Sequence, residues 1–286
     1  DSISCLSNVC THRANIIVHK QSEQKNLRCL YHGRKFNLDG EFKSMPDFEE
    51  AKNFPRDCEN LKSFPVSRLG PFLFTSLEPE FNIKKIFDEI ANRLSFFKFE
   101  KLVERPDLTS EHIVKANWAI YCENYLDPFH IPFVHKELTS VLDINQYKTE
   151  IYDNYNLQIG YSKDDEDSFK IPEGNKDFGK KISAYYYWIF PNLMLNFYPW
   201  GLSINVITPI NKNRTKVSFI QFMLDESKYD LGAGGLIDKV EREDEFVVEE
   251  VSKGLESRYY STGRFSPTKE TAIHHFHSLI AKFINS

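Results

Sequence analysis

Two short cysteine–histidine pairs near the start of the chain constrain its fold more than any other feature. Cys10 is followed by His12, and Cys29 is followed by His32. Each pair offers one thiolate and one imidazole, so the two loops together supply two sulfur and two nitrogen ligands. In a 2Fe–2S cluster of mixed ligation the thiolates bind one iron and the imidazoles the other, and the imidazoles raise the reduction potential. The pairs therefore predict a one-electron carrier held between two loops.

A structural zinc ion is the main alternative for two cysteines and two histidines. Zinc fingers usually keep their cysteines in one pair and their histidines in the other. Here each pair is mixed, which favours the iron–sulfur cluster.

The bulk properties exclude several classes of protein. The chain has 286 residues and is 41% hydrophobic, enough for a core in one large or two moderate domains. A net charge of -5 gives no basic field for nucleic acid, and no apolar run reaches the roughly 18 residues of a membrane span. Cys5, Cys58 and Cys122 form an odd remainder rather than a disulfide framework. We expect a cytoplasmic protein.

The pattern of hydrophobic residues changes near residue 79. Residues 1–78 show short strands and loops that end in an apolar strand at 71–77, whereas 83–97 has the periodicity of an amphipathic helix. Antiparallel strands are expected at 184–189, 193–198, 202–208 and 216–223. The prediction is an α+β protein with a small β domain at 1–78 and a larger domain at 79–286, whose antiparallel sheet is flanked by helices.

Two helices are expected to close the chain. One covers 235–254, and another begins at Ser266-Pro267, where Ser would be the N-cap and Pro the first helical residue. The polar stretch 162–181 is expected to be a flexible loop or lid.

A second group of metal-binding residues lies about a hundred residues after the cysteine–histidine pairs. On a helix, Asp127 and His130 would share a face. His135 follows, and Pro132 would interrupt the helix and let the chain bend so that both imidazoles approach one point. Two histidines and one carboxylate form the facial triad of non-haem Fe(II) oxygenases. The two histidines therefore predict a mononuclear iron site.

Helical periodicity narrows the choice of that carboxylate within 235–254. Asp244 falls near the middle of an apolar stripe and Glu241 at its edge, so Asp244 is the predicted ligand and Glu241 the second choice. The remaining acidic residues, Glu243, Glu245, Glu249 and Glu250, are expected on a solvated face. His274, His275 and His277 lie on a helix that already has an apolar core face, so no metal site is expected there.

Both motifs resemble those of the Rieske non-haem iron oxygenases. Residues 10–13 and 29–33 resemble the two cluster loops, and Asp127-x2-His130-x4-His135 resembles the mononuclear iron motif. The resemblance implies that His130 and His135 bind iron and that Asp127 links the two metal sites. In the family this link runs between neighbouring subunits, which implies a head-to-tail homotrimer.

The sequence also departs from the family in two places. The family usually has Trp after the His-Gly pair, where this chain has Arg34, a change expected to affect packing or partner contacts and not ligation. A Rieske domain should also contain strands before Asp1, so we expect that part of this domain is missing from the N-terminus.

The resemblance implies the terminal oxygenase component of such a system, which uses O2 on a small organic substrate. No Gly-rich nucleotide-binding fingerprint is present, so a reductase or ferredoxin is expected to donate the electrons. Residues 254–264 resemble the choline and carnitine monooxygenase branch, and the aromatic strands could either bind a trimethylammonium group or pack the core. An aromatic ring-hydroxylating dioxygenase alpha subunit is the alternative. A Rieske electron-transfer protein, which would need only the first domain, is a more distant one.

Overall fold

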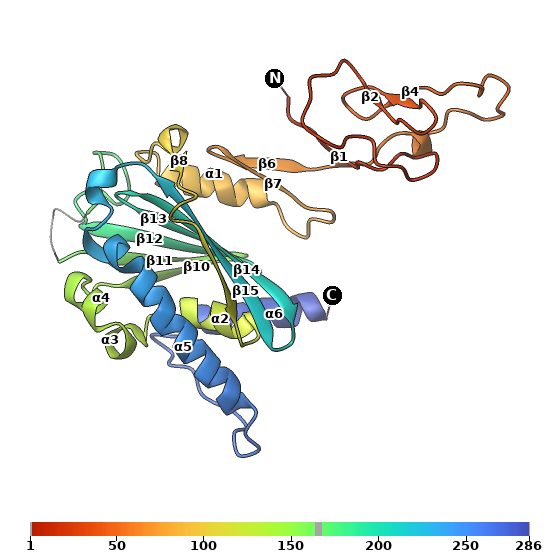
Figure 1. Ribbon diagram of the computed structural model, residues 1–286. Helices are drawn as coiled ribbons and strands as arrows, with labels where there is room; N and C mark the ends of the chain where they lie inside the picture. Colours follow the sequence, from red (N-terminus) through yellow and green to blue (C-terminus); the bar gives the residue numbers. More distant parts are fainter. Residues whose placement is uncertain (1, 164–167, 286) are drawn as a thin grey trace. The chain divides into compact units, whose positions relative to one another are not determined.

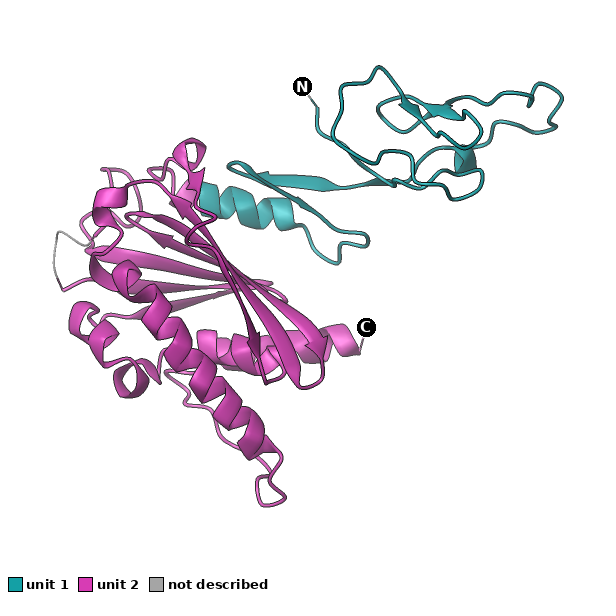
Figure 2. Cartoon of the chain, viewed as in Figure 1, with its two compact units in different colours: residues 1–91 teal, residues 92–286 magenta. Residues whose placement is uncertain are grey.

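The computed structural model describes residues 2–163 and 168–285, which form two compact units, Asp1–Ala91 and Asn92–Ser286 (Figure 2). A small unit of short strands precedes a larger unit with an antiparallel sheet and helices, so the predicted α+β class is confirmed. The domain boundary predicted after residue 78 stays a prediction.

Short antiparallel strands build the first unit. Strand β1 pairs with β5, β3 lies between β2 and β4, and β6 pairs with β7, which precedes helix α1. Their bounds are β1 Cys5–Leu6, β2 Leu27–Arg28, β3 Lys35–Phe36, β4 Phe42–Ser44, β5 Ser63–Phe64, β6 Val66–Leu69, β7 Phe72–Thr75 and α1 Ile83–Arg93. A small core of Cys10, Ile17, Cys29, Phe36 and Leu61 lies directly beneath the two predicted cluster loops. Helix α1 is shorter than the 83–97 prediction.

Arg34 is part of the interior of this unit. Its side chain is 1% exposed, and its guanidinium pairs with the carboxylate of Glu59. The guanidinium carbon lies 5.7, 4.9 and 5.6 Å from the ring centroids of Phe36, Phe42 and Phe54. A buried cation thus occupies an aromatic site, held by one buried anion. Arg34, which follows the His-Gly pair, therefore contributes to packing, in agreement with the prediction.

Removal of one partner of this ion pair is expected to destabilise the first unit strongly. Arg34→Ala leaves the Glu59 carboxylate buried without its main partner and should lower the free energy of unfolding by about 3–5 kcal/mol. In the wild-type protein, the hydrogen bond that Glu59 accepts from Arg34 keeps the pKa of Glu59 below its usual range. The ion pair therefore stabilises the fold fully at pH values above the pKa of an unfolded glutamate. This stabilisation is lost as the pH falls through the lowered pKa of Glu59 in the folded protein.

Denaturant unfolding of the cluster-loaded protein, followed by cluster absorbance, measures the loss. The double variant Arg34→Met/Glu59→Gln is the control, because it removes both charges and should cost less than Arg34→Ala alone. If the double variant loses as much free energy of unfolding as the two single variants lose in sum, the charges do not interact.

An eight-stranded antiparallel sheet forms the centre of the second unit (Figure 1). Its strand order is β10-β11-β12-β13-β14-β15-β8, and β9 also pairs with β15. The bounds are β8 Val103–Glu104, β9 Ser110–Val114, β10 Lys148–Tyr152, β11 Tyr155–Tyr161, β12 Ile182–Ile189, β13 Leu193–Tyr198, β14 Gly201–Asn211 and β15 Arg214–Met223. All four predicted strands are present, and β13 has the predicted bounds.

The aromatic run in β12 is divided between the two faces of the sheet because side chains alternate along a strand. Tyr187 packs at 5.9 Å from the ring of Phe197, on one face. Tyr186 lies 5.8 Å from Tyr198, on the opposite face. Trp188 shares that second face and packs at 5.2 Å from Phe276 of the C-terminal helix. The second face is therefore the one that the helices cover.

Five α-helices among the described residues complete this unit, and α2 packs against both α5 and β14. Their bounds are α2 Trp118–Tyr125, α3 Ile131–Val134, α4 Lys136–Val141, α5 Ile237–Leu255 and α6 Thr271–Ile284. The helix predicted to begin at Ser266-Pro267 begins later, at Thr271, so this prediction is wrong. Ser266 caps a separate turn instead, in which its hydroxyl accepts a hydrogen bond from the Lys269 N–H at 3.2 Å.

The polar stretch 162–181 was predicted to be a flexible loop or lid, and residues 164–167 of it lie outside the described residues. Its remaining part is anchored. Phe169 is buried, and Asp177 is 0% exposed and pairs with Arg93 at 2.7 Å. A buried ion pair of this kind holds residues 168–181 against the rest of the unit, so the described part is not a free loop.

Candidate metal centres and active site

The first unit brings the two predicted cluster loops together. Backbone bonds close each loop, from the Ala14 N–H to the Cys10 carbonyl at 2.9 Å and from the Gly33 N–H to the Cys29 carbonyl at 3.1 Å. Gly33 has φ 75°, a left-handed conformation that glycine adopts without strain. The rings of His12 and His32, which follow Cys10 and Cys29, lie with their centroids 4.7 Å apart.

The chemistry of these four side chains fits a cluster of mixed ligation. Nδ1 of His12 is buried and has no hydrogen-bond partner among the described residues, as expected for a nitrogen that binds a metal. Burial and the nearby positive groups of His32, Arg34 and Arg13 lower the pKa of His12, which keeps the imidazole neutral. Burial opposes the Cys29 thiolate, but the N–H groups of Tyr31 and His32 and the Cys10 thiol lower its pKa. Neutral imidazole and thiolate are the ligand forms that a cluster needs.

The second unit gathers His130, His135 and Asp244 into one group. Their ligand atoms lie within 4.8 Å of one another. The Nε2 atoms of the two histidines are 3.0 Å apart, and Oδ1 of Asp244 lies 3.3 Å from the first and 3.0 Å from the second. All three side chains thus converge on one point, with the two-histidine, one-carboxylate donor set that suits ferrous iron.

The segment around Asp127 folds differently from the prediction. Asp127 and His130 do not share a helix but lie in the connection between α2 and α3, and Pro132 lies at the start of α3 rather than interrupting a helix. Oδ1 of Asp127 accepts a hydrogen bond from the Phe129 N–H at 2.7 Å, which forms a turn. Its Oδ2 lies 3.4 Å from Nδ1 of His130. The turn, not a helical face, brings these two side chains together.

Glu243 is a functional residue that the sequence prediction missed. It was expected on the solvated face of α5, but its Oε2 lies 2.7 Å from Nδ1 of His135. A carboxylate that accepts the second N–H of a ligating histidine fixes the ring and its tautomer. The prediction for Glu245 is also wrong in part, because its carboxylate pairs with His112 at 2.7 Å. Glu241, the second choice as a ligand, lies outside the group that converges.

The binding of a metal by this group should depend on pH. Burial opposes a charge on His130, but Asp127 and Asp244 outweigh it and raise the pKa of His130 to about 9. Because this value exceeds that of an unfolded histidine, the protonated ring stabilises the apo protein near neutral pH, and this contribution is lost as the pH rises through about 9. A metal must displace this proton, so its affinity should rise about tenfold per pH unit between about pH 7 and 9.

Titration of the apo protein with Co(II), followed by its visible absorption, measures this dependence. His277→Ala is a matched control, because His277 pairs with Glu123 at 2.8 Å, away from the converging group, and should show the same slope. A Co(II) affinity independent of pH would contradict the protonation of His130 in the apo protein.

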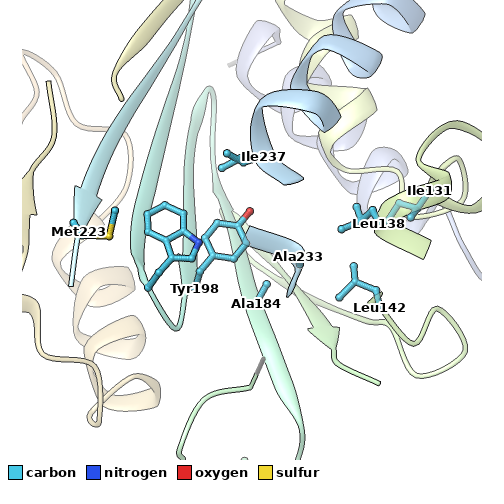
Figure 3. Close-up of a cluster of buried hydrophobic side chains, with 9 residues drawn as sticks. Ile131, Leu138, Leu142, Ala184, Tyr198, Met223, Ala233 and Ile237 are labelled. Carbon is cyan, nitrogen blue, oxygen red and sulfur yellow. The ribbon is translucent and has the colours of Figure 1, made fainter. Parts of the chain in front are cut away.

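The converging group lies in the wall of a cavity of about 100 Å³ between the sheet and the helices. Apolar side chains form much of its lining. Figure 3 shows the buried cluster that borders it, with Tyr198 of β13 on one side, Ile237 of α5 above, and Ile131, Leu138 and Leu142 opposite. Tyr147 and Tyr186 add further rings to this lining. The arrangement can hold a small, largely apolar ligand beside a metal ion.

Two histidines of α6 contact polar side chains of other elements. Nδ1 of His275 lies 2.9 Å from the amide oxygen of Asn156, and His277 contacts Glu123. Neither histidine belongs to the group of possible metal ligands found among the described residues.

Two family models match the chain and define its class. Residues 1–64 match the Rieske [2Fe-2S] domain, and residues 99–286 match the catalytic domain of the ring hydroxylating alpha subunit. The fold and sites thus define an iron-dependent oxygenase of the Rieske class. The chain belongs to the ring-hydroxylating alpha subunit family, and both cofactor predictions, the 2Fe–2S cluster and mononuclear iron, are confirmed.

Curated relatives fall in the predicted branch. A chloroplastic choline monooxygenase of Arabidopsis thaliana is 31% identical, with 97% of this chain and 68% of that protein covered. The choline monooxygenase of Beta vulgaris is 29% identical, with 94% and 61% covered. The carnitine monooxygenase oxygenase subunit of Escherichia coli K12 is 29% identical, with 96% and 76% covered. The chain thus spans roughly two thirds of the length of the choline monooxygenases that it matches.

Solved structures share the fold. A quaternary ammonium Rieske monooxygenase superposes with a TM-score of 0.70 at 20% identity, with 98% of this chain and 78% of that chain covered. A naphthalene 1,2-dioxygenase with bound indole superposes with a TM-score of 0.63 at 19% identity, with 100% and 79% covered.

Proposed function

We propose that this protein is the terminal oxygenase component of a Rieske non-haem iron system and that it oxygenates a small quaternary ammonium compound with O2. One observation carries the proposal: His130, His135 and Asp244 converge in the wall of a cavity that is lined with tyrosine rings. Iron held by these three residues supplies the activation of O2, with electrons that arrive through the cluster of the first unit.

The chain's own residues position the reacting groups. Nε2 of both histidines and Oδ1 of Asp244 face the metal position, while Glu243 holds the His135 ring through its Nδ1–H. Thr139 closes the turn behind His135 with a hydrogen bond from its hydroxyl to the His135 carbonyl at 2.9 Å. These contacts fix the direction of the ligands before substrate enters.

Asp127 is proposed to link the two metal sites. One of its oxygens closes the local turn, and the other faces Nδ1 of His130. In the proposed homotrimer, Asp127 would also accept a hydrogen bond from a cluster histidine of a neighbouring subunit and carry the electron path between them. The electron donor would be a reductase or ferredoxin.

A reducing cytoplasm is the proposed compartment. All five cysteines are free in this structure, two of them reserved for the cluster. No helix among the described residues is both long and apolar enough to cross a membrane.

The relatives support an ammonium substrate, since the curated proteins that match are choline and carnitine monooxygenases. The alternative is an aromatic ring-hydroxylating dioxygenase, which the structural similarity to naphthalene 1,2-dioxygenase favours. A Rieske electron-transfer protein, the more distant alternative, would need only the first domain, and the match of residues 99–286 to the catalytic domain argues against it.

A turnover experiment separates these possibilities. The iron-loaded, reduced protein is incubated with labelled O2 and a panel of quaternary ammonium compounds and aromatic acids, and products are identified by mass spectrometry. One labelled oxygen atom in an ammonium product, or in the aldehyde released on demethylation, supports the proposal. A cis-diol from an aromatic acid would replace it with the dioxygenase alternative.

A further inference from the structure

Glu241 is a buried acid that the mononuclear centre does not use. It lies on α5 one turn before Asp244, is 8% exposed, and lines the same cavity as the converging histidines. Its Oε1 is buried without a hydrogen-bond partner among the described residues. A buried carboxyl with no partner is costly, and native proteins rarely keep one without a ligand or a catalytic reason.

No lysine or arginine side chain among the described residues of the lining faces this carboxyl, and the two histidines of the lining would be neutral as metal ligands. Burial, together with the negative charges of Asp238, Asp244 and Glu245, holds the pKa of Glu241 far above its usual range. Iron bound by Asp244 and the two histidines would keep one positive charge beyond that of Asp244, but Glu241 lies outside that ligand group. In the empty cavity Glu241 is thus a neutral acid, and a cation that enters would stabilise its carboxylate form.

Three tyrosine rings in the lining of the same cavity suit a methylated cation. Tyr186 stacks on Tyr147 with ring centroids 6.4 Å apart and meets Tyr198 edge to face at 5.8 Å. Aromatic rings attract a quaternary ammonium group by about 0.5–2 kcal/mol each. Rings and a carboxylate in one lining would hold the ammonium group by complementary contacts.

Neutral amides supply several of the remaining polar groups of the lining. Oδ1 of Asn196 accepts a hydrogen bond from the Tyr125 hydroxyl at 2.8 Å, and Nε2 of Gln158 donates to the Tyr125 carbonyl at 2.8 Å. Asn205 also lines the cavity. Amides can bond a hydroxyl on the substrate, but a substrate carboxylate would meet no lysine or arginine among the described residues of the lining, which also contains Glu241 and Asp127.

We propose that Glu241 is a specificity-determining residue that binds the ammonium group of the substrate, so that the cavity selects a monocation with an uncharged tail, such as choline, over a zwitterion, such as carnitine. This inference rests on the proposed oxygenation of a quaternary ammonium substrate. It also distinguishes between the two kinds of relative, which differ in whether the substrate carries a carboxylate.

Equilibrium binding tests the inference without turnover. Isothermal titration calorimetry on the reduced, anaerobic, iron-loaded protein compares choline, L-carnitine and 3,3-dimethylbutan-1-ol, the neutral carbon analogue of choline. Wild type should bind choline about 10–100-fold more tightly than either of the others. Glu241→Gln should lose about that factor for choline and keep its affinity for the neutral analogue, so the preference for charge disappears.

Two variants on α5 separate charge from folding. Glu241→Asp keeps the charge and should retain a preference for choline over the neutral analogue. Glu250→Gln alters an exposed acid that pairs with Lys253 and should bind all three ligands as wild type does. If Glu241→Gln cannot be obtained as iron-loaded protein, the preference of wild type and of Glu241→Asp decides the outcome.

The outcomes distinguish the inference from the function on which it rests. Wild-type affinity for choline in Glu241→Gln, or equal affinity of wild type for choline and carnitine, would overturn the inference even if ammonium substrates are oxygenated. Failure of wild type to bind or to oxygenate any quaternary ammonium compound would overturn both.

Discussion

Replacement of Asp244 by alanine is expected to abolish the iron that the protein binds outside the cluster, while the absorption of the cluster itself is unchanged. Asp244 supplies the only carboxylate within ligand distance of both histidines among the described residues, at 3.3 and 3.0 Å. Two imidazoles alone hold ferrous iron weakly, because ferrous sites rely on an anionic oxygen to complete the facial triad. Product formation should therefore fall by at least about 100-fold. Iron analysis together with the visible spectrum measures both effects.

Glu250→Ala is the matched control for this variant. Glu250 lies on the same helix, is exposed and pairs with Lys253, so its removal should leave iron content and turnover unchanged. An Asp244→Ala protein with the iron content of wild type would refute the ligand assignment, and Glu241 would then be the next carboxylate to test.

Replacement of Asp127 by alanine is expected to leave both metals bound but to lower product formation by about 10–100-fold. The reason is its position: Oδ2 of Asp127 faces the outer nitrogen of the His130 ring at 3.4 Å, so it can orient a ligand without being one. In single-turnover experiments, the reduced cluster should be oxidised more slowly, by a similar factor, after O2 is added in the presence of substrate.

Asp127→Asn separates the electron path from the local turn. Asparagine keeps the oxygen that accepts the Phe129 N–H, so the connection between α2 and α3 should fold normally. It removes the negative charge that faces His130, so turnover should remain low if Asp127 links the sites. Turnover near that of wild type in both variants would show that Asp127 only closes the turn.

The fold could be predicted from the sequence where the hydrophobic pattern was regular. Strand β13 has the predicted bounds because alternation and two turns define it, and α5 differs from its prediction by only a few residues. The start of α6 was wrong because Ser266 and Pro267 form a capped turn of their own, a local signal that also occurs without a helix. The connection between α2 and α3 was wrong for a similar reason: a helical spacing of Asp127 and His130 also fits a turn.

The convergence of His130, His135 and Asp244 could be predicted from the sequence, but the contacts around them could not. Ile237, Glu241, Asp244 and Val248 are spaced by four, three and four residues, which places them on one face of α5. Val251 and Leu255 continue the apolar pattern of this segment but are exposed, because the end of α5 extends past the sheet (Figure 1). This shifted the expected face, so Glu243 was placed in solvent and Glu241 at the edge. The positions of Glu243 and Glu241 become clear only from the packing of α5 against its neighbours.

Electron paramagnetic resonance of the reduced protein with nitric oxide, recorded with and without choline, tests the central claim most directly. Nitric oxide reports ferrous iron that has an open coordination position, and its signal responds to a ligand in the adjacent cavity. Our account predicts a high-spin signal that is absent in Asp244→Ala and that changes its line shape when choline is added. A wild-type protein without this signal, or with a signal that choline does not alter, would contradict the proposal of an iron site beside an ammonium-binding cavity.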